Sequence, residues 1–289
     1  MTLKGFVDKS VKDLSALYPE AEAKSMVIRL LSHYLELPEY CCISDPDRKI
    51  SAAEQQKLDG AMGDLLKWRP LQYVLGFTDF GGRRFKVIEG VLIPRPETEE
   101  LFGIIVDDLS ERELDEEQDF NILDVGTGSG CLAWSLSAEL AGAQVFGCDI
   151  SDAALRVAGK QKVKSTEGPV KRPVFFWADM LKPPPAGLPQ FDVIVSNPPY
   201  VLESERPQMR LNVLGYEPEP ALFVPDDDPL LFYRALLSWT KLLLRERGIC
   251  YFEINERFGS EVADLFGPGT TVLKDINGRD RFVKHVNKA

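Results

Sequence analysis

The sequence predicts an α/β protein with a mainly parallel sheet, preceded by a smaller helical unit. From about residue 97 onward, short β-branched or apolar runs alternate with helical patterns, which is typical of a parallel sheet with crossover helices. A glycine turn, Gly126 to Gly130, follows the first predicted strand, and Asn197-Pro198-Pro199-Tyr200 follows a later one. Because such sheets bind ligands at the carboxyl ends of their strands, we expect both turns at the same edge.

Residues 1–70 are predicted to form a helical domain. Apolar residues between Ala23 and Leu35 recur at i, i+3 and i+4, which gives one apolar stripe on a helix. Ser51 and Glu54 form a capping box at the start of a later helix, and Pro70 ends it. From the pattern alone, such a small bundle could serve only to add stability.

Residues 71–96 are predicted to form a β-hairpin linker. Aromatic and β-branched residues on either side of Gly81-Gly82 favour two short antiparallel strands. The stiff stretch Ile93 to Pro96 either lines a cleft or is a linker in polyproline geometry.

Residues 97–289 are predicted to form the domain that contains the sheet. Strands are expected at residues 121–125, 144–148, 174–177, 192–196 and 249–254, and a helix at 230–244. Residues 271–276 and 281–286 flank Asn277-Gly278, which predicts a closing antiparallel hairpin.

The glycine turn lets the backbone approach a nucleotide-like ligand at the end of the strand that precedes it. Its spacing is G-x-G-x-G, which differs from the G-x-G-x-x-G of dinucleotide sites. The next predicted strand ends at Asp149, whose carboxylate could accept both hydroxyls of a ribose. The order of turn and acid therefore predicts a nucleoside-containing cofactor.

The elbow, defined as Asn197 to Tyr200, is predicted to bind a planar –NH2 group. Neither proline has an N–H, and the residue before a proline is forced into extended geometry, so the chain presents carbonyl oxygens, one amide and one ring. The alternative is a proline-rich turn without a ligand.

The motifs together resemble those of one known family. The stretch Asp124 to Gly130 with Asp149 resembles the S-adenosylmethionine (AdoMet) site of Rossmann-like methyltransferases, and the elbow resembles their motif for amide or exocyclic amino groups. Four further stretches are similar to the release factor glutamine methyltransferases, and with them the resemblance covers essentially the whole chain. They are residues 69–76, residues 91–99, Tyr216-Glu217-Pro218 and Gly278-Arg279-Asp280-Arg281.

The resemblance implies a Rossmann-like AdoMet-dependent methyltransferase domain with a mainly parallel, seven-stranded sheet. It also implies AdoMet as cofactor, S-adenosylhomocysteine as product, and as substrate the side-chain amide of the glutamine in the Gly-Gly-Gln loop of peptide chain release factors. In the resembled family the helical domain helps to recognise this protein substrate. At position 228 the chain has Asp228-Pro229-Leu230 where the family usually has a glycine.

The residues implied for cofactor binding are Asp124, Gly126, Thr127, Gly128, Ser129, Gly130, Asp149, Ile150, Asp179, Met180 and Asn197. Asn197, Pro198, Pro199 and Tyr200 are expected to bind the substrate amide, and Asn197, Pro198 and Tyr200 to act in catalysis. Asp179, at the end of a strand, could equally be a cap for the local turn.

Composition narrows the remaining function classes. The net charge of −11 argues against an extended nucleic-acid surface, and no apolar run is long enough to predict a membrane span. Five cysteines without C-x-x-C spacing and two histidines disfavour a metal site. We expect a cytoplasmic monomer with the acidic run 111–119 as a solvated linker. The basic stretch 160–172 is either a solvated helix end and loop or part of a docking surface.

Two other functions are compatible with some of the same motifs. A nucleic-acid methyltransferase acting on adenine N6 or guanine N2 would also present an –NH2 beside a π-face, and a duplex base would have to be flipped out. An AdoMet-binding adaptor without catalysis would not need the elbow. The acidic chain and the motifs around the hairpin favour the protein substrate.

Overall fold

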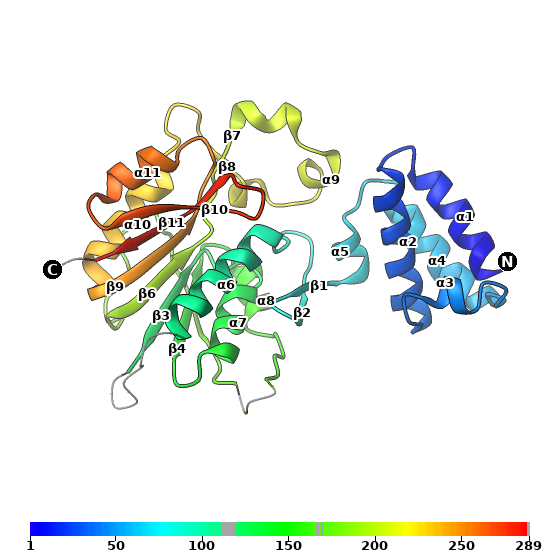
Figure 1. The fold of residues 1–289 in the computed structure, drawn as a ribbon, viewed down its shortest axis with the longest axis horizontal. Helices are drawn as coiled ribbons and strands as arrows, with labels where there is room; N and C mark the ends of the chain where they lie inside the picture. The colour runs from blue at the N-terminus through cyan, green and yellow to red at the C-terminus, as the bar shows by residue number, and fades with distance from the viewer. Residues whose placement is uncertain (111–118, 166–167, 169, 288–289) are drawn as a thin grey trace. The chain divides into compact units, whose positions relative to one another are not determined.

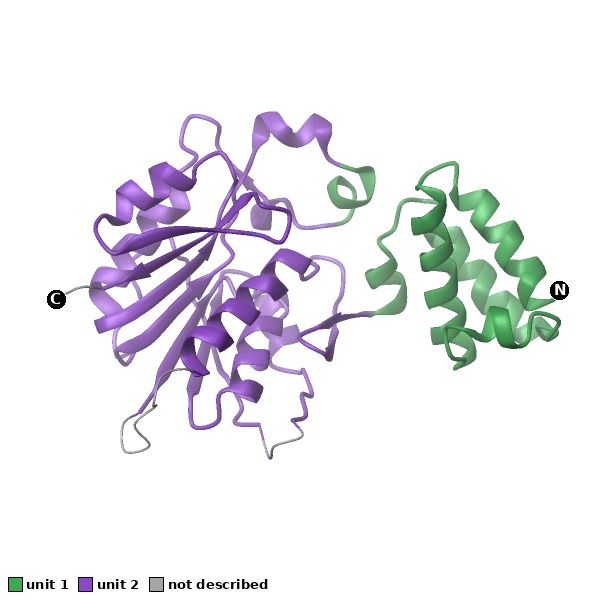
Figure 2. Cartoon of the chain, in the orientation of Figure 1, with its two compact units in different colours: residues 1–76, 210–216 green, residues 77–209, 217–289 purple. Residues whose placement is uncertain are grey.

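The computed structural model describes residues 1–110, 119–165, 168 and 170–287. The acidic run at 111–119 therefore lies outside the described residues except for Asp119, as does part of the basic stretch 160–172. Contacts divide the chain into two compact units, shown in two colours in Figure 2. Unit 1 comprises residues 1–76 and 210–216, and unit 2 comprises residues 77–209 and 217–289.

Unit 1 is a helical bundle. Its helices are α1 (Leu3–Leu14), α2 (Glu20–Leu35), α3 (Cys41–Ser44), α4 (Ala52–Leu65) and α5 (Leu71–Leu75). The predicted apolar stripe of α2 lies in the core, where Ala23, Val27 and Leu30 are completely buried. The predicted capping box at the start of α4 is confirmed, since Ser51 and Glu54 each bond the other's backbone N–H.

Unit 1 also contains a segment that is distant in sequence. Residues 210–216, which include the short helix α9 (Leu211–Leu214), group with the bundle and not with their neighbours in the chain. The Arg210 Nη1 lies 2.8 Å from the Glu22 carboxylate on α2, and the Tyr216 hydroxyl donates to the Lys67 carbonyl at 2.8 Å. The sequence motif Tyr216-Glu217-Pro218 thus starts in one unit and ends in the other. The predicted division at residues 70 and 96 stays a prediction.

The hairpin expected around Gly81-Gly82 is present as β1 (Phe77–Phe80) and β2 (Arg83–Lys86), which pair antiparallel. Residues 71–75, which were expected to contribute to the same extended region, are helical instead. The helix begins after Pro70 and ends at Gly76, whose φ of 79° is the left-handed conformation that glycine adopts without strain.

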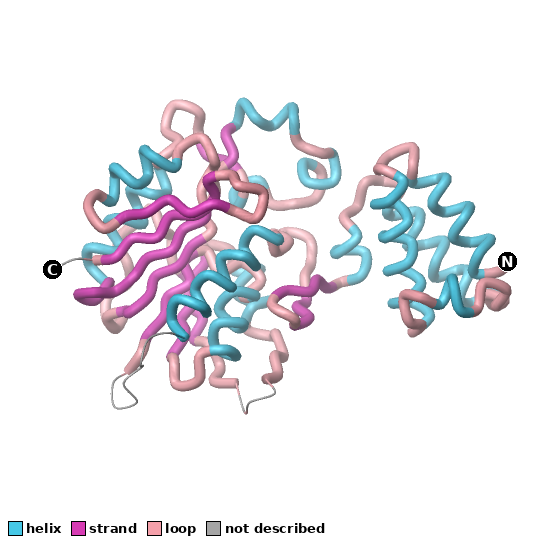
Figure 3. Tube along the Cα trace, in the orientation of Figure 1, coloured by secondary structure: helices cyan, strands magenta, loops and turns pink. Residues whose placement is uncertain are grey.

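Unit 2 is built on the predicted seven-stranded sheet, whose strands are magenta in Figure 3. Its strand order is β10-β11-β9-β6-β3-β4-β5. Five neighbouring strands are parallel, and β11 and β10 continue the sheet antiparallel. The strands are β3 (Asn121–Val125), β4 (Gln144–Asp149), β5 (Val174–Trp177), β6 (Phe191–Ser196), β9 (Leu244–Glu253), β10 (Thr270–Lys274) and β11 (Asp280–Val286). A small pair, β7 (Val201–Leu202) and β8 (Phe223–Val224), lies outside this sheet.

Helices cover both faces of the sheet (Figure 1). The helices α6 (Pro96–Ser110) and α7 (Cys131–Glu139) pack on one face, and α10 (Leu231–Leu243) and α11 (Gly259–Phe266) on the other. Successive residues of a strand point to opposite faces, so Val193 and Val195 enter the first core and Ile194 the second. The helix α8 (Asp152–Ala158) packs against β4 and β5. Two 3-10 turns, Glu203–Gln208 and Glu219–Ala221, complete the unit.

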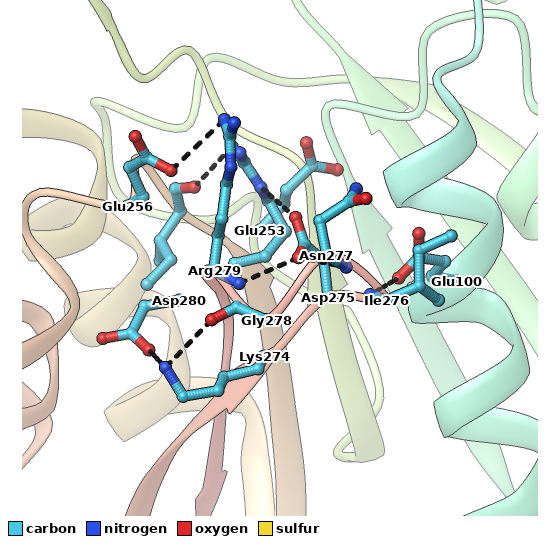
Figure 4. A network of polar contacts seen from close by, with 12 residues as sticks. Glu100, Glu253, Glu256, Lys274, Asp275, Ile276, Asn277, Gly278, Arg279 and Asp280 are labelled. Atoms are coloured by element: carbon cyan, nitrogen blue, oxygen red, sulfur yellow. Dashed lines mark hydrogen bonds and ion pairs between the residues drawn. The ribbon is translucent and has the colours of Figure 1, made fainter.

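The turn between β10 and β11 is tied to helix α6. Figure 4 shows the Asp275 carboxylate accepting the backbone N–H groups of Asn277 and Arg279, at 2.9 and 3.0 Å. The N–H of Ile276 donates to Glu100 on α6 at 3.0 Å. These bonds hold the hairpin against the first turns of α6, the helix that contributes Thr98 to the site described below. Within the part of the chain that the structure describes, no helix is long and apolar enough to cross a bilayer.

Candidate functional site

The site lies where the strand order reverses. The chain proceeds from β3 outward to β4 and β5 and then returns to β6 on the other side of β3, which opens a crevice at the carboxyl ends of β3 and β6. A pocket lies in unit 2 at this place. It is lined by Leu92, Pro94, Arg95, Thr98, Asp124, Gly126, Thr127, Gly128, Ser129, Cys131, Leu132 and Asn197.

The glycine turn is fixed by bonds to the neighbouring strand. The backbone N–H groups of Gly126 and Thr127 both donate to the Cys148 carbonyl on β4, at 2.8 and 2.9 Å. Gly130 has a φ of 78° and precedes α7, and a Cβ there would lie 2.8 Å from the Ala158 Cβ on α8. Glycine at 130 is therefore needed both for the backbone conformation and for the close approach of α8.

Asp124 is a buried acid at the end of β3. Its side chain accepts a hydrogen bond from the Thr127 hydroxyl at 2.6 Å. Burial raises the pKa of Asp124 to about 7, and the negative charge of Asp149 acts in the same direction. An isolated carboxylate at this depth is costly, so a positively charged ligand group beside it would be stabilising.

Asp149 ends β4, as predicted, and its two oxygens are already engaged with backbone. One accepts from the Gly128 N–H and the other from the Ser151 N–H, both at 2.8 Å. Burial raises the pKa of Asp149, against the lowering effect of these two bonds. A carboxylate has about four lone-pair positions, so it retains capacity for a ligand's hydroxyls while it holds the glycine turn in place.

The remaining residues implied for the cofactor lie around this turn but do not line the pocket. Ile150 follows Asp149 and is 57% exposed. The Asp179 carboxylate accepts the Leu181 N–H at 3.0 Å, and its role toward a cofactor stays a prediction. The methyl carbon of Met180 lies 3.4 Å from the position that a Cβ on Gly126 would occupy.

The elbow leaves β6 at the same edge. Pro198 and Pro199 are buried, whereas Asn197 is half-buried and lines the pocket. The Asn197 Nδ2 donates to the Thr98 hydroxyl on α6 at 2.9 Å, which leaves Oδ1 as the free acceptor of this amide. The Tyr200 hydroxyl donates to Glu253 at 2.7 Å and its ring packs against the second core. Pro198, Pro199 and Tyr200 do not line the pocket.

The stretch Ile93 to Pro96 contributes one wall of the pocket through Pro94 and Arg95, the first of the two alternatives considered from the sequence. Glu217, which is 6% exposed, holds this wall. Its carboxylate accepts the Ile93 N–H at 3.1 Å and the Arg95 guanidinium at 2.8 Å.

Sequence reasoning left three polar residues around the site without a role: Thr98, Glu217 and Glu253. Thr98 and Glu217 lie within the motifs at residues 91–99 and 216–218, and Glu253 lies within the predicted strand 249–254. Each acts through a partner far away in the chain, and for example 155 residues separate Thr98 from Glu253.

Comparison with known proteins gives the family. The Methyltransferase small domain model matches residues 106–213. A release factor glutamine methyltransferase of Bacteroides thetaiotaomicron is 38% identical over 286 residues, which are 97% of this chain and 98% of the relative. One from Flavobacterium psychrophilum is also 38% identical, over 98% of this chain and 99% of the relative.

A solved structure described as a release factor-specific protein-(glutamine-N5) methyltransferase, from Alicyclobacillus acidocaldarius, is 26% identical. It matches 68% of this chain and 95% of its own with a TM-score of 0.41. The assignment rests on the two full-length relatives. With their identity over almost the whole of both chains, the protein belongs to the release factor glutamine methyltransferase family.

Proposed function

We propose that this protein transfers the methyl group of AdoMet to the side-chain amide nitrogen of the glutamine in the Gly-Gly-Gln loop of peptide chain release factors. The observation that carries the proposal is the position of Asn197. It lines the pocket beside the glycine turn, and its amide nitrogen is already bonded to Thr98, so that its oxygen is available to a ligand N–H.

The residues present fit AdoMet. The glycine turn offers close approach of backbone, Asp149 offers a carboxylate at the end of the neighbouring strand for ribose hydroxyls, and Asp124 offers a buried acid for a cationic amino group. When bound, AdoMet supplies an activated methyl group on a sulfonium leaving group. Ile150, Asp179 and Met180 would surround the adenine.

The protein's own task is then to position a poor nucleophile. A carboxamide nitrogen shares its lone pair with the carbonyl, so it reacts slowly unless it is held in line. Asn197 Oδ1 and the Pro198 carbonyl would each accept one N–H of the substrate amide, and the Tyr200 ring would lie against the amide plane. Acceptors that fit the transition state better than the ground state raise kcat.

Substitution of Asn197 by alanine tests the acceptor site. We expect turnover to fall by about a hundredfold or more, because one preorganised contact to the reacting group is lost. AdoMet affinity measured by calorimetry should stay within about twofold of that of the parent, since the lost contact is to the substrate. Near-normal turnover in a folded variant would contradict the acceptor site.

Incubation with methyl-labelled AdoMet and separate purified acceptors tests the substrate. We expect label on a release factor, and none on a release factor whose loop glutamine is replaced by alanine. DNA, tRNA and rRNA serve as the competing acceptors. Label on a nucleic acid and not on the release factor would instead favour a methyltransferase that acts on adenine N6 or guanine N2.

A further inference from the structure

Glu253 is a completely buried acid beside the elbow. It is the last residue of β9, and the register pairs Ser196 of β6 with Phe252 of β9, so the next residues of the two strands, Asn197 and Glu253, emerge at the same edge. A buried carboxylate without a metal or an ion pair needs hydrogen-bond donors for its oxygens. Two hydroxyl groups supply them.

The two oxygens of Glu253 serve two different residues. Oε2 accepts from the Thr98 hydroxyl at 2.8 Å, and Oε1 accepts from the Tyr200 hydroxyl at 2.7 Å. Thr98 in turn accepts from Asn197 Nδ2 at 2.9 Å. The chain of donors therefore runs from Asn197 through Thr98 to Glu253.

The direction of these hydrogen bonds determines whether the oxygen or the nitrogen of the Asn197 amide faces the pocket. A hydroxyl has one hydrogen, so if Thr98 donates to Glu253, its lone pair can only accept, and the group that it accepts from must be the amide nitrogen of Asn197. If Glu253 donated to Thr98, the Thr98 hydrogen would turn to Asn197. The amide would then have to present its NH2 to the pocket, where it would oppose a substrate NH2.

We propose that Glu253 is a positioning residue that acts through Thr98 to keep the Asn197 oxygen turned toward the substrate amide, while its second oxygen anchors Tyr200. This inference rests on the proposed function, because it assigns Asn197 Oδ1 to the substrate. Glu253 touches neither substrate nor cofactor. Its carboxylate form, which only accepts hydrogen bonds, is the form that specifies the amide orientation.

The environment of Glu253 gives the sign of the expected pH dependence. Burial raises the pKa of Glu253, the hydrogen bonds from Tyr200 and Thr98 and the charge of Arg281 lower it, and Glu97 raises it. The groups that face Glu253 come from four elements: Thr98 and Glu97 on α6, Tyr200 on the elbow, Arg281 on β11 and Tyr233 on α10. Because protonation reverses the chain of donors, kcat should fall as the pH drops through the pKa of Glu253.

The test uses isosteric changes in the full-length protein. Thr98→Val removes only the hydroxyl, and we expect kcat to fall by about tenfold or more while AdoMet affinity is unchanged. Thr98→Ser restores the hydroxyl and should recover most of kcat. Glu253→Gln replaces one acceptor by a donor and should lower kcat similarly. The double variant Thr98→Val with Glu253→Gln should have a kcat no lower than that of the slower single variant, because both substitutions break the same series of hydrogen bonds.

Tyr233→Phe is the matched control. The Tyr233 hydroxyl donates to the backbone carbonyl of Glu253 at 3.1 Å, so its removal disturbs the same buried region without touching the carboxylate. We expect lower thermal stability with normal kcat. If Thr98→Val kept normal kcat, or if Tyr233→Phe lost as much kcat as Thr98→Val, the network would be structural only and the inference would fail.

A spectroscopic measurement separates this inference from the proposed function. The side-chain NH2 resonances of Asn197, assigned by comparison with Asn197→Asp, should shift with pH in the parent protein and lose this shift in Glu253→Gln and in Thr98→Val. If they behave so while no release factor is methylated, the proposed function fails and the positioning role stands. If they do not follow pH in the parent, the positioning role fails whichever acceptor is methylated.

Discussion

At the scale of single residues, we expect Asp124 to couple its own protonation state to cofactor binding. Its pKa of about 7 results chiefly from burial, so close to neutral pH a large fraction of the molecules hold a proton there. A cationic amino group beside the carboxylate would favour the ionised form. Ligand binding would then release this proton.

We therefore expect AdoMet affinity to fall as the pH drops below about 7, approaching tenfold per pH unit, because the carboxyl must first be deprotonated. Asp124→Asn should bind more weakly and with little pH dependence. Calorimetry in two buffers of different ionisation enthalpy measures the number of protons released. An unchanged slope in Asp124→Asn would show that another group is responsible.

Single residues also show how much of the site could be predicted from the sequence. Asp124 lies near the end of a predicted strand, and the glycine turn, Asp149 and the elbow each directly follow one. Local pattern and the rule of strand ends were therefore enough to expect them at one edge of the sheet. Thr98, Glu217 and Glu253 pair with partners 53 to 155 residues away, and such pairs leave no local pattern. The register of β6 against β9 and the position of α6 bring Thr98 and Glu253 together, and Glu217 meets the stretch before α6 at Ile93 and Arg95.

At the scale of elements, the packing of α7 against α8 depends on Gly130, and Gly142 provides a matched control. Both glycines have a positive φ, 78° and 91°, but a Cβ at 142 would meet nothing within 4 Å. Gly142→Ala should cost about 1–2 kcal/mol of stability from backbone strain alone. Gly130→Ala should cost a further 1–3 kcal/mol, roughly, because the methyl group meets Ala158.

Urea denaturation of the two variants measures this difference directly, provided that both show the m-value of the parent. Equal losses would mean that α8 moves away from α7 at no cost. A lower AdoMet affinity in Gly130→Ala alone would be further support, since Gly130 belongs to the glycine turn and Gly142 does not.

The wall of the pocket is a second prediction at this scale. Removal of the Glu217 carboxylate leaves the buried Ile93 N–H and the Arg95 guanidinium without their acceptor, so Glu217→Ala should cost about 1–3 kcal/mol of stability. It should also weaken AdoMet binding, because Pro94 and Arg95 line the pocket. Glu219→Ala, two residues away and bonded to Arg206 on the surface, is the control that should change neither.

The strands were predicted more accurately than the linker for a physical reason. The strand β3 is completely buried, β5 consists of apolar residues, and the bounds of both match the prediction because each apolar run has clear ends. The strand β9 begins at Leu244, before the predicted Ile249, because Leu244 pairs with Phe191 of β6 ahead of a register shift. The exposed residues Glu246 and Arg247, between Leu244 and Ile249, give no apolar pattern from which this start could be predicted. In α5, Tyr73 and Val74 favour a strand locally, but Pro70 and Gly76 delimit one helical turn.

At the scale of the whole molecule, we infer that the helical domain selects the release factor. The elbow accepts a primary amide, which every Asn and Gln side chain has, so discrimination needs a contact remote from the pocket. Deletion of residues 1–70 would also remove the partners of Arg210 and Tyr216, so surface substitution is the cleaner experiment. Tyr40 and Ile43 of unit 1 are 65% and 84% exposed.

Tyr40→Ser combined with Ile43→Ser should raise the KM for an intact release factor by about tenfold if this surface is used, since two exposed apolar contacts are lost. Activity on a short Gly-Gly-Gln peptide should not change, because the peptide does not reach that surface. Leu242→Ser, which alters an exposed apolar residue on α10, is the control. Equal losses on peptide and whole factor would assign the helical domain a stabilising role only.

The grouping of residues 210–216 with the helical bundle determines which fragments stay associated after proteolytic cleavage. The backbone passes between the two units three times, after residues 76, 209 and 216. A protease that cuts once near residue 76 would leave the amino-terminal fragment bound to the rest through the Arg210 and Tyr216 contacts. The two pieces should co-elute on gel filtration and separate only in denaturant.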